Sequence, residues 1–237
     1  MNNLPSTINE KNIPHSFCPG CGHPIALHAI ASVIEKMALG KEAVVGLDIG
    51  CSLLAWNLYN FDSFHTHHGR TVSTMLGFKR ANPKSLVIVY QGDGGAYAIG
   101  LQSLLTSAHR DDPLTVIIIN NTLYAMTGGQ MSPTTVLGEK TSTTPRGRNI
   151  RQGPKFLGPE TIKELASERA YIARGSVENP IELETMIRKA LERQRAGHFA
   201  FVEVLSPCPV NWKTAAHETF ERLNELKTEY RLGELNE

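Results

Sequence analysis

Hydrophobic positions along the chain alternate between short aliphatic runs, typical of buried strands, and stretches with the period of an amphipathic helix. The predicted strands occupy residues 43–47, 85–90, 114–119 and 199–205. The predicted helices occupy residues 25–37, 97–109, 159–169, 181–195 and a charged tail at 215–237. This alternation predicts an α/β fold in which helices flank a mostly parallel sheet. No repeat or change in composition divides the chain, so we expect a single domain over residues 1–237, with residues 1–16 as a polar arm.

Charge and composition narrow the classes of function. The 24 Lys and Arg residues nearly balance 23 Asp and Glu residues, so no surface-wide positive field favours a nucleic-acid partner. The longest aliphatic run, residues 116–119, is far shorter than the roughly 20 apolar residues that span a membrane. Residues 1–16 also lack the apolar core of a signal peptide. We therefore expect a cytoplasmic protein with neither nucleic-acid nor membrane partners.

Polar residues follow two of the predicted strands. Asp93 stands just after strand 85–90, and Asn121 just after strand 114–119. One helix joins these strands, so we expect them to be parallel and to end at the same edge of the sheet. Carboxylate and amide oxygens there suit Mg²⁺ with a phosphorylated ligand, and the glycines after Asp93 would let a diphosphate approach the backbone. The alternative is a Gly-Asp-Gly turn and an Asn-Asn turn without a ligand.

Four cysteines are too few for a disulfide scaffold and instead indicate metal or redox chemistry. Cys18 and Cys21 form a C-x₂-C knuckle, Cys51 follows the first predicted strand and Cys208 follows the last. All four could meet at the edge that carries Asp93. Three interpretations remain open: unrelated buried cysteines, a structural zinc site and a [4Fe–4S] cluster. The nearby phosphate-cofactor edge favours the cluster.

Taken in order, these motifs give the chain a close resemblance to a known family. From about residue 17 to 213 it resembles the thiamine-diphosphate-binding β subunit of 2-oxoacid:ferredoxin oxidoreductases, with the 2-oxoglutarate and 2-oxoisovalerate types nearest. The resemblance implies the pyrophosphate-binding type of α/β fold. It is carried by seven motifs in sequence order: residues 18–22, 49–52, 68–70, 92–94, 121–130, 132–134 and 206–208.

The resemblance also implies roles for individual residues. Mg²⁺ would be held by Asp93, the side chain of Asn121 and the main-chain oxygen of Leu123. One [4Fe–4S] cluster would be held by Cys18, Cys21, Cys51 and Cys208. His68 is the candidate catalytic residue. Thiamine diphosphate would be contacted by Ile49, Gly50, Cys51, Ser52, His68, Gly94, Gly95, Ala125, Met126 and Thr127.

Two residues depart from the family pattern. Gly95 stands where many relatives carry an acidic residue, and we expect it to lose a hydrogen bond behind the diphosphate. Ala125 stands where many relatives carry glycine, and it adds a methyl group where the chain passes the cofactor. Neither departure removes a predicted metal ligand.

The function implied by the resemblance is the oxidative decarboxylation of a 2-oxoacid to acyl-CoA and CO₂, or the reverse. Electrons would pass through the cluster to ferredoxin. The implied partners are an α subunit, with γ or δ subunits as an open addition, together with ferredoxin, coenzyme A and the 2-oxoacid. In this family the α subunit supplies the glutamate that activates the cofactor. The alternatives are a non-redox thiamine-diphosphate decarboxylase or synthase subunit and a zinc-stabilised binding module.

Two weaker signals complete the sequence. His23 follows the cysteine knuckle and is a candidate for tuning a cluster sulfur or for stabilising the turn. The polar stretch 127–159 is long enough to be a functional loop. Its basic residues could receive coenzyme A phosphates or an acidic ferredoxin, or form an ordinary solvated surface. They are Lys140, Arg146, Arg148, Arg151 and Lys155.

Overall fold

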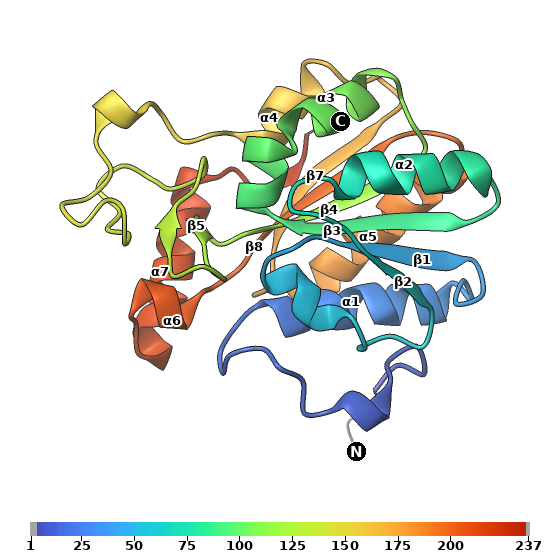
Figure 1. Cartoon of the computed structure of the whole chain (residues 1–237), viewed down its shortest axis with the longest axis horizontal. Coiled ribbons are helices and arrows are strands. Elements are labelled where there is room, and N and C mark those ends of the chain that lie inside the picture. The colour runs from blue at the N-terminus through green and yellow to red at the C-terminus, as the bar shows by residue number, and fades with distance from the viewer. Residues whose placement is uncertain (1–3, 236–237) are drawn as a thin grey trace.

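A seven-stranded sheet lies at the centre of the computed structural model, which describes residues 4–235 (Figure 1). Its strands are β1 (Ala43–Leu47), β2 (Asp62–His65), β3 (Leu86–Gly92), β4 (Thr115–Asn120), β7 (Tyr171–Ser176), β8 (Ala200–Leu205) and β9 (Gly233–Glu234). They lie in the order β2-β1-β3-β4-β8-β7-β9, and all neighbours are parallel except β9, which is antiparallel to β7. The predicted mostly parallel α/β fold is confirmed.

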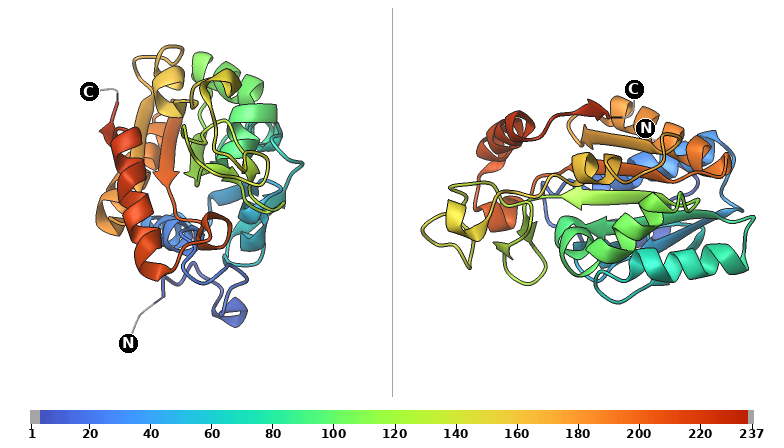
Figure 2. Two further views of the ribbon diagram at one scale, coloured as in Figure 1. Left: turned by 90° about the vertical axis from the view of Figure 1, so that its left-hand side faces the viewer. Right: turned by 90° about the horizontal axis from the view of Figure 1, so that it is seen from above.

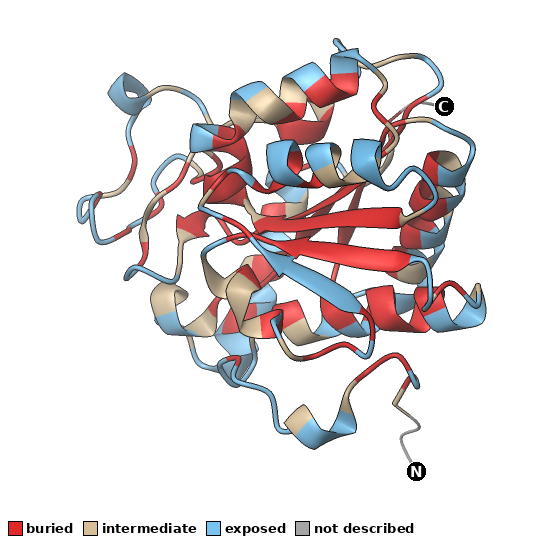
Figure 3. Cartoon of the chain, turned by 45° about the vertical axis from the view of Figure 1, so that its right-hand side comes forward, coloured by how far each residue is buried: buried red, intermediate tan, exposed pale blue. Residues whose placement is uncertain are grey.

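Helices cover both faces of this sheet (Figures 1 and 2). One face carries α1 (His23–Lys36) and α5 (Pro180–Arg195); the other carries α2 (Thr71–Ala81), α3 (Leu101–His109) and α4 (Gly158–Lys163). Strand side chains alternate between the two cores, so Ile88 packs on the α1 side and Val87 on the α2 side. The central strands are buried, whereas edge strand β2 is exposed along its length (Figure 3). Within residues 4–235, no helix combines the length and apolarity needed to cross a membrane.

The four predicted strands are present as β1, β3, β4 and β8, with ends that differ by at most two residues. The sequence analysis missed β2 and β7, and the reasons are visible in their residues. β2 is exposed throughout and has no aliphatic run, while Arg174 and Gly175 interrupt the apolar pattern of β7. It also missed α2, which connects β2 to β3.

The helices predicted at 25–37 and 181–195 are present as α1 and α5 with ends that differ by at most two residues, whereas the other three differ more. The helix predicted at 159–169 was wrong in length, because α4 ends at Lys163 and the chain then turns to begin β7. The helix predicted at 97–109 starts earlier, as a π-helical turn η3 (Gly95–Ile99), before α3. The tail at 215–237 was wrong beyond Glu229, where α7 (Ala216–Glu229) ends and the chain turns to form β9. Residues 236–237 of that prediction lie outside the described residues.

The predicted N-terminal arm packs on the body of the molecule, as far as the structure describes it. Residues 1–3 of the arm lie outside the described residues. Thr7 donates a hydrogen bond to the Ala31 carbonyl of α1 at 2.8 Å, and Ile8 is buried and pairs with Tyr59. The arm leads into the Cys18–Cys21 knuckle, which directly precedes α1. The knuckle is therefore anchored on both sides.

The order of the strands creates a reversal between β1 and β3. β1 lies between β2 and β3 in the sheet. From β1 the chain continues to β2 on one side, whereas from β3 it continues to β4 on the opposite side. Open α/β sheets bind ligands in the crevice outside the carboxyl ends of the strands at such a point. Residues that directly follow β1, β3 and β4 therefore have the best position for a site.

A buried ionic network stabilises the far half of the sheet. Arg174 on β7 is fully buried, and its Nε donates to Glu203 of β8 at 2.5 Å. Its terminal nitrogens pair with Glu160 of α4 at 2.6 Å. The Tyr97 hydroxyl donates to the second oxygen of Glu203, and the Arg174 guanidinium lies 5.1 Å from the centre of the Tyr230 ring. Together these contacts fix α4 and η3 to the sheet.

Replacing Arg174 with Met leaves Glu203 buried without its positive partner. Removing one partner of a buried ion pair costs about 3–5 kcal/mol, so we expect Arg174→Met to lower the free energy of unfolding by that amount in a urea titration. Arg188→Met is the matched control, because Arg188 pairs with Glu192 on the exposed side of α5, where such pairs contribute about 0.3–0.5 kcal/mol. Equal losses in the two variants would contradict the role assigned to the network.

Candidate cofactor site

A cavity of about 280 Å³ opens at the carboxyl ends of β1, β3 and β4, at the point where the strand order reverses. Every residue predicted to contact thiamine diphosphate or magnesium lines it: Ile49, Gly50, Cys51, Ser52, His68, Asp93, Gly94, Gly95, Asn121, Leu123, Ala125, Met126 and Thr127. Four further residues line it that the sequence analysis did not assign to the cofactor: His23, Asp48, Gly92 and Tyr124. Asp48 directly follows β1, so the search for polar residues at strand ends that selected Asp93 could have found it.

Asp93 is a buried carboxylate at the end of β3, and only 1% of it is exposed. The Ser132 hydroxyl donates to its Oδ2 at 2.6 Å, and the Thr134 hydroxyl donates to the same oxygen. Burial raises the pKa of Asp93 to about 7, against the opposite effect of these hydrogen bonds. Among residues 4–235, no basic side chain forms an ion pair with it. The site thus presents a buried carboxylate that a cation would keep charged.

Asn121 and Leu123 reach the cavity from a strained turn at the end of β4. The Asn120 side-chain oxygen accepts from the Thr122 N–H at 3.1 Å, and that of Asn121 accepts from the Leu123 N–H at 3.2 Å. Thr122, between them, has a φ of +65°. This left-handed conformation is unfavourable for a β-branched residue, so the turn needs support from its surroundings.

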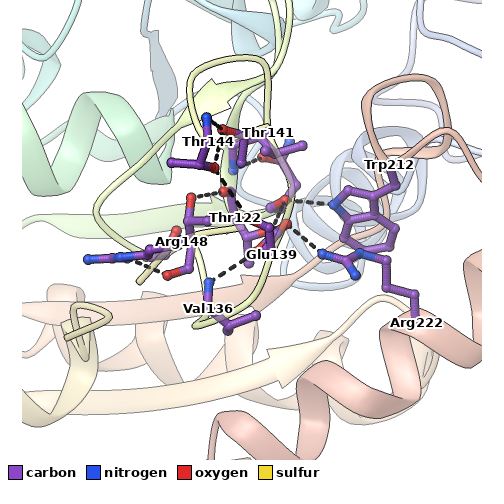
Figure 4. Close-up of polar contacts among 12 residues, drawn as sticks. Thr122, Val136, Glu139, Thr141, Thr144, Arg148, Trp212 and Arg222 are labelled. Carbon is purple, nitrogen blue, oxygen red and sulfur yellow. Dashed lines mark hydrogen bonds and ion pairs between the residues drawn. The ribbon is translucent and has the colours of Figure 1, made fainter. Parts of the chain in front are cut away.

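Glu139 and the C-terminal segment give that support (Figure 4). Glu139 Oε1 accepts from the Thr122 hydroxyl at 2.6 Å and pairs with Arg222 of α7 at 2.6 Å. The Trp212 indole N–H donates to the Asn121 carbonyl at 3.1 Å, and the Arg222 guanidinium lies 5.0 Å from the centre of the Trp212 ring. The loop that carries Glu139 and the charged tail helix α7 therefore hold the turn between Asn121 and Leu123.

The residues on this wall of the cavity fit a magnesium-bound diphosphate. A carboxylate, an amide oxygen and a main-chain carbonyl are the hard oxygen ligands that Mg²⁺ takes, with ligand phosphates and water completing its octahedron. A Cβ on Gly94 would lie 2.3 Å from the Tyr124 ring, so only glycine allows this packing. The Tyr124 ring thus occupies the space that a side chain at position 94 would need, and the Gly94 N–H forms a hydrogen bond with the Asp93 carboxylate.

Asp48 places a second buried carboxylate against the cavity and orients His68. Its Oδ1 accepts from the Gly69 N–H at 2.6 Å and from the Thr71 hydroxyl at 3.0 Å. Its Oδ2 lies 3.3 Å from Nδ1 of His68, which also lies 2.7 Å from the Ile49 carbonyl. Since both neighbours are acceptors, Nδ1 carries the donor proton, and proton exchange with a ligand would take place at Nε2.

A carboxylate from the end of β1 lies beside Gly95. A Cβ at this position would lie 2.2 Å from Oδ2 of Asp48, so the Asp48 carboxylate already fills the space beside Gly95. An acidic group therefore lies behind the cavity without one at position 95, and the loss of a hydrogen bond to the diphosphate stays a prediction.

The structure brings the four cysteines to the same edge of the sheet. The Gly22 N–H donates to the Pro207 carbonyl at 3.4 Å, and a Cβ on Gly22 would lie 2.4 Å from Ser206 Oγ, so the knuckle packs against the turn that carries Cys208. Cys51 lines the cavity itself. Burial raises the pKa of Cys21 to about 11 and of Cys51 to about 12, with further contributions from the neighbouring thiols.

Cys18, Cys21 and Cys208 do not line the cavity, so the thiols lie beside it and only Cys51 belongs to both regions. Within the described residues, no three His, Cys, Asp or Glu side chains converge as ligands of a single ion. A [4Fe–4S] cluster takes one thiolate at each of four irons, so its ligands need not converge on one point. The number and chemistry of the thiols fit that cluster.

His23 contacts the thiols through its main chain and not through its ring. The ring nitrogen Nδ1 lies 2.8 Å from the Tyr90 hydroxyl, and burial lowers the pKa of His23 to about 3, so the ring is neutral. The main-chain N–H of His23 forms a hydrogen bond with the Cys21 sulfur. The ring therefore attaches the start of α1 to β3, while the main chain contacts a predicted cluster ligand, so both roles predicted for His23 stay open.

Two of the five basic residues in the loop have structural partners. Arg148 is buried and donates to the carbonyls of Pro133 at 3.0 Å and Pro154 at 2.8 Å. Lys155 pairs with Glu229. These two residues hold the loop against the body, which weakens the interpretation that the whole segment receives a ligand. The basic residues that remain exposed are Lys140, Arg146 and Arg151.

The parallel sheet and the cavity at its reversal point define the class of α/β proteins that bind phosphorylated cofactors at the sheet edge. Comparison with known proteins narrows this class. The family described as thiamine pyrophosphate enzyme, C-terminal TPP binding domain, matches residues 48–204. The chain is 37% identical over 205 residues to the 2-oxoglutarate synthase subunit KorB of Methanocaldococcus jannaschii, covering 85% of this chain and 72% of the relative.

Two further matches agree with this. The ketoisovalerate oxidoreductase subunit VorA of Methanothermobacter thermautotrophicus is 38% identical over 204 residues, which cover 84% of this chain but only 43% of the length of VorA. A solved 2-oxoglutarate:ferredoxin oxidoreductase from Magnetococcus marinus, with 2-oxoglutarate, coenzyme A and succinyl-CoA bound, superposes with a TM-score of 0.79. That match has 25% identity and covers 88% of this chain and 69% of the other. The chain therefore belongs to the thiamine pyrophosphate enzymes, in the branch of the 2-oxoacid:ferredoxin oxidoreductase β subunits.

Gly95→Ala tests the packing of Asp48 against the cavity. The added methyl group must displace the Asp48 carboxylate, and overpacking of this kind costs about 1–3 kcal/mol, so we expect thiamine diphosphate affinity to fall about tenfold or more in calorimetric titrations with Mg²⁺. Gly77→Ala in α2 is the control, since a Cβ there meets no atom within 4 Å. The double variant Asp48→Gly with Gly95→Asp should recover part of the affinity. A folded double variant that binds thiamine diphosphate no better than Gly95→Ala would contradict the expectation that a carboxylate at position 95 can replace that of Asp48.

Proposed function

We propose that this chain is the thiamine-diphosphate-binding β subunit of an enzyme that oxidatively decarboxylates a 2-oxoacid with coenzyme A and passes electrons to ferredoxin. One observation carries the proposal: the hard oxygen donors around Asp93 and the four thiols lie at the same edge of one sheet. A non-redox thiamine enzyme would account for the cavity but not for the four thiols. A zinc-stabilised binding module would account for the thiols but not for the cavity. The names of the relatives, which mention 2-oxoglutarate and ketoisovalerate, support a 2-oxoacid as substrate.

Asp93, the Asn121 side chain and the Leu123 carbonyl are proposed to hold Mg²⁺, which in turn binds the diphosphate. Burial of Asp93 supports this role, because a divalent cation would stabilise its charged form. The N–H groups beside Gly94 and Gly95 would donate to the diphosphate oxygens. Ile49, Gly50, Ser52 and the turn of residues 125–127 would enclose the rest of the cofactor.

Thiamine diphosphate supplies the electron sink that decarboxylation of a 2-oxoacid requires. The residues of this chain would position the cofactor and offer a side chain that can accept a proton. The Asp48 carboxylate and the Ile49 carbonyl orient the His68 ring, so that Nε2 can accept a proton from a group in the cavity. The exposed side chains of Ile49 and Met126 leave the mouth of the cavity apolar, and there a partner subunit would exclude water.

Cys18, Cys21, Cys51 and Cys208 are proposed to hold one [4Fe–4S] cluster. Cys51 supports this arrangement, since it lines the cavity and also interacts electrostatically with the other three thiols. A cluster held there would lie next to the cofactor, where it can accept electrons. Ferredoxin, coenzyme A and an α subunit are the partners that this chemistry requires.

An anaerobic preparation of the chain separates the proposal from its alternatives. We expect iron, acid-labile sulfide and Mg²⁺-dependent binding of thiamine diphosphate. Asp93→Asn should lose the Mg²⁺-dependent binding of thiamine diphosphate and retain the iron. The carboxamide that replaces the carboxylate is a weaker ligand for a divalent cation. Cys208→Ser should lose the iron and retain thiamine diphosphate binding. Thiamine diphosphate without iron would indicate the non-redox enzyme, and zinc without thiamine diphosphate would indicate the binding module.

We expect the purified chain alone to bind its cofactors without turning over a 2-oxoacid. The reason is that the activating glutamate is assigned by the family resemblance to the α subunit. The measurement is 2-oxoacid-dependent reduction of a viologen dye in the presence of coenzyme A, with the assembled complex as the positive control. Turnover by the single chain would contradict the assignment.

A further inference from the structure

Asn211 connects the thiol region to the cavity through one side chain. It lies in the short helix α6 (Pro209–Trp212), three residues after Cys208. Its Nδ2 lies 3.4 Å from the Cys208 sulfur and 3.0 Å from the Ala125 carbonyl, so both of its amide hydrogens have acceptors. The main-chain N–H of Asn211 also forms a hydrogen bond with the Cys208 sulfur. Ala125 in turn lines the cavity.

The packing around Asn211 leaves its side chain little freedom. Gly129, with a φ of +75°, passes so close that a Cβ there would lie 2.8 Å from Asn211 Oδ1. The next residue, Trp212, is fixed by its hydrogen bond to the Asn121 carbonyl. The segment after Cys208 is thus attached to the turn that carries Asn121 and to the turn that begins at Ala125.

Hydrogen bonds to a thiolate sulfur have a definite effect on a bound cluster. Reduction adds negative charge, and an N–H donor stabilises the more negative state, so each such bond raises the reduction potential. The side-chain N–H of Asn211 donates to the Cys208 sulfur at 3.4 Å. The same amide group holds the Ala125 carbonyl, so a change at Asn211 acts on both regions.

We propose that Asn211 is a positioning residue that raises the potential of a cluster bound through Cys208 and fixes the Ala125 turn against it. This inference rests on the proposed function, because it assumes that Cys208 is a cluster ligand. It makes a separate claim about the reduction potential of the cluster. That potential depends on the carboxamide of residue 211, and not merely on a side chain of that size.

The test uses the anaerobically purified chain, or its complex, with two substitutions. Asn211→Leu keeps the approximate volume and removes the donor, and Asn211→Gln keeps a carboxamide that can donate again from a longer side chain. Asn82→Leu is the matched control: Asn82 donates to the Phe78 carbonyl at the end of α2 and precedes β3, whereas Asp93 follows β3. Each protein is analysed for iron and sulfide and then titrated electrochemically, with the reduced cluster followed by electron paramagnetic resonance.

We expect Asn211→Leu to keep its iron, because the main-chain N–H and the thiolate remain. At a fixed ambient potential its ratio of reduced to oxidised cluster should fall about tenfold, the equivalent of about 59 mV for a one-electron couple. Thiamine diphosphate should also bind more weakly, since the Ala125 turn loses its anchor. Asn211→Gln should recover part of both properties, and Asn82→Leu should match the unmodified chain.

The outcomes that overturn the inference differ from those that overturn the proposed function. An Asn211→Leu variant with the unmodified potential would refute the tuning role and leave the proposed function intact. Loss of iron from both Asn211 variants, with iron retained in Asn82→Leu, would also refute it, because Asn211 would then be a structural residue. Absence of iron and sulfide from the unmodified chain would instead refute the proposed function itself.

Discussion

The burial of the Asp93 carboxylate is the constraint on which the site depends. A carboxylate at the end of a central parallel strand is removed from water, and within the described residues it has hydroxyl donors but no positive partner. Burial raises the pKa of Asp93 to about 7, so a cation beside it would stabilise the charged form. A metal at Asp93 could also be bound by the neighbouring oxygen donors, and it could hold a diphosphate against the backbone at the adjacent glycines.

Much of the chain beyond the central strands serves to shape the turn opposite Asp93. Thr122 adopts a left-handed conformation that orients Asn121 and Leu123, and it is held by Glu139 from the long loop. Glu139 is in turn paired with Arg222 from the tail helix. The polar loop and the charged tail are therefore parts of the site, although they contribute none of the proposed metal ligands. Function at this edge depends on contacts that span most of the chain.

The segment after Cys208 gives the thiols a fixed relation to the cavity. Asn211 and Trp212 donate hydrogen bonds to the carbonyls of Ala125 and Asn121, so the segment after the last cysteine is attached to both turns at the cavity. Asp48 makes a similar connection on the other side, where it joins the end of β1 to His68. The electron transfer proposed for this edge would require such a fixed, short separation between donor and acceptor.

The sequence by itself determined the four central strands, their parallel direction and the gathering of polar residues and cysteines at one edge. It could do so because aliphatic periodicity and the residues that follow each strand are local signals. Only the tertiary structure decided the rest. β7 carries a buried arginine whose partners lie on α4 and β8, so no local pattern predicts it as a strand. The carboxylate beside Gly95 comes from Asp48, and the Thr122 turn is held by Glu139 and Arg222. These pairings join residues far apart in the chain, and their geometry exists only after the sheet has formed.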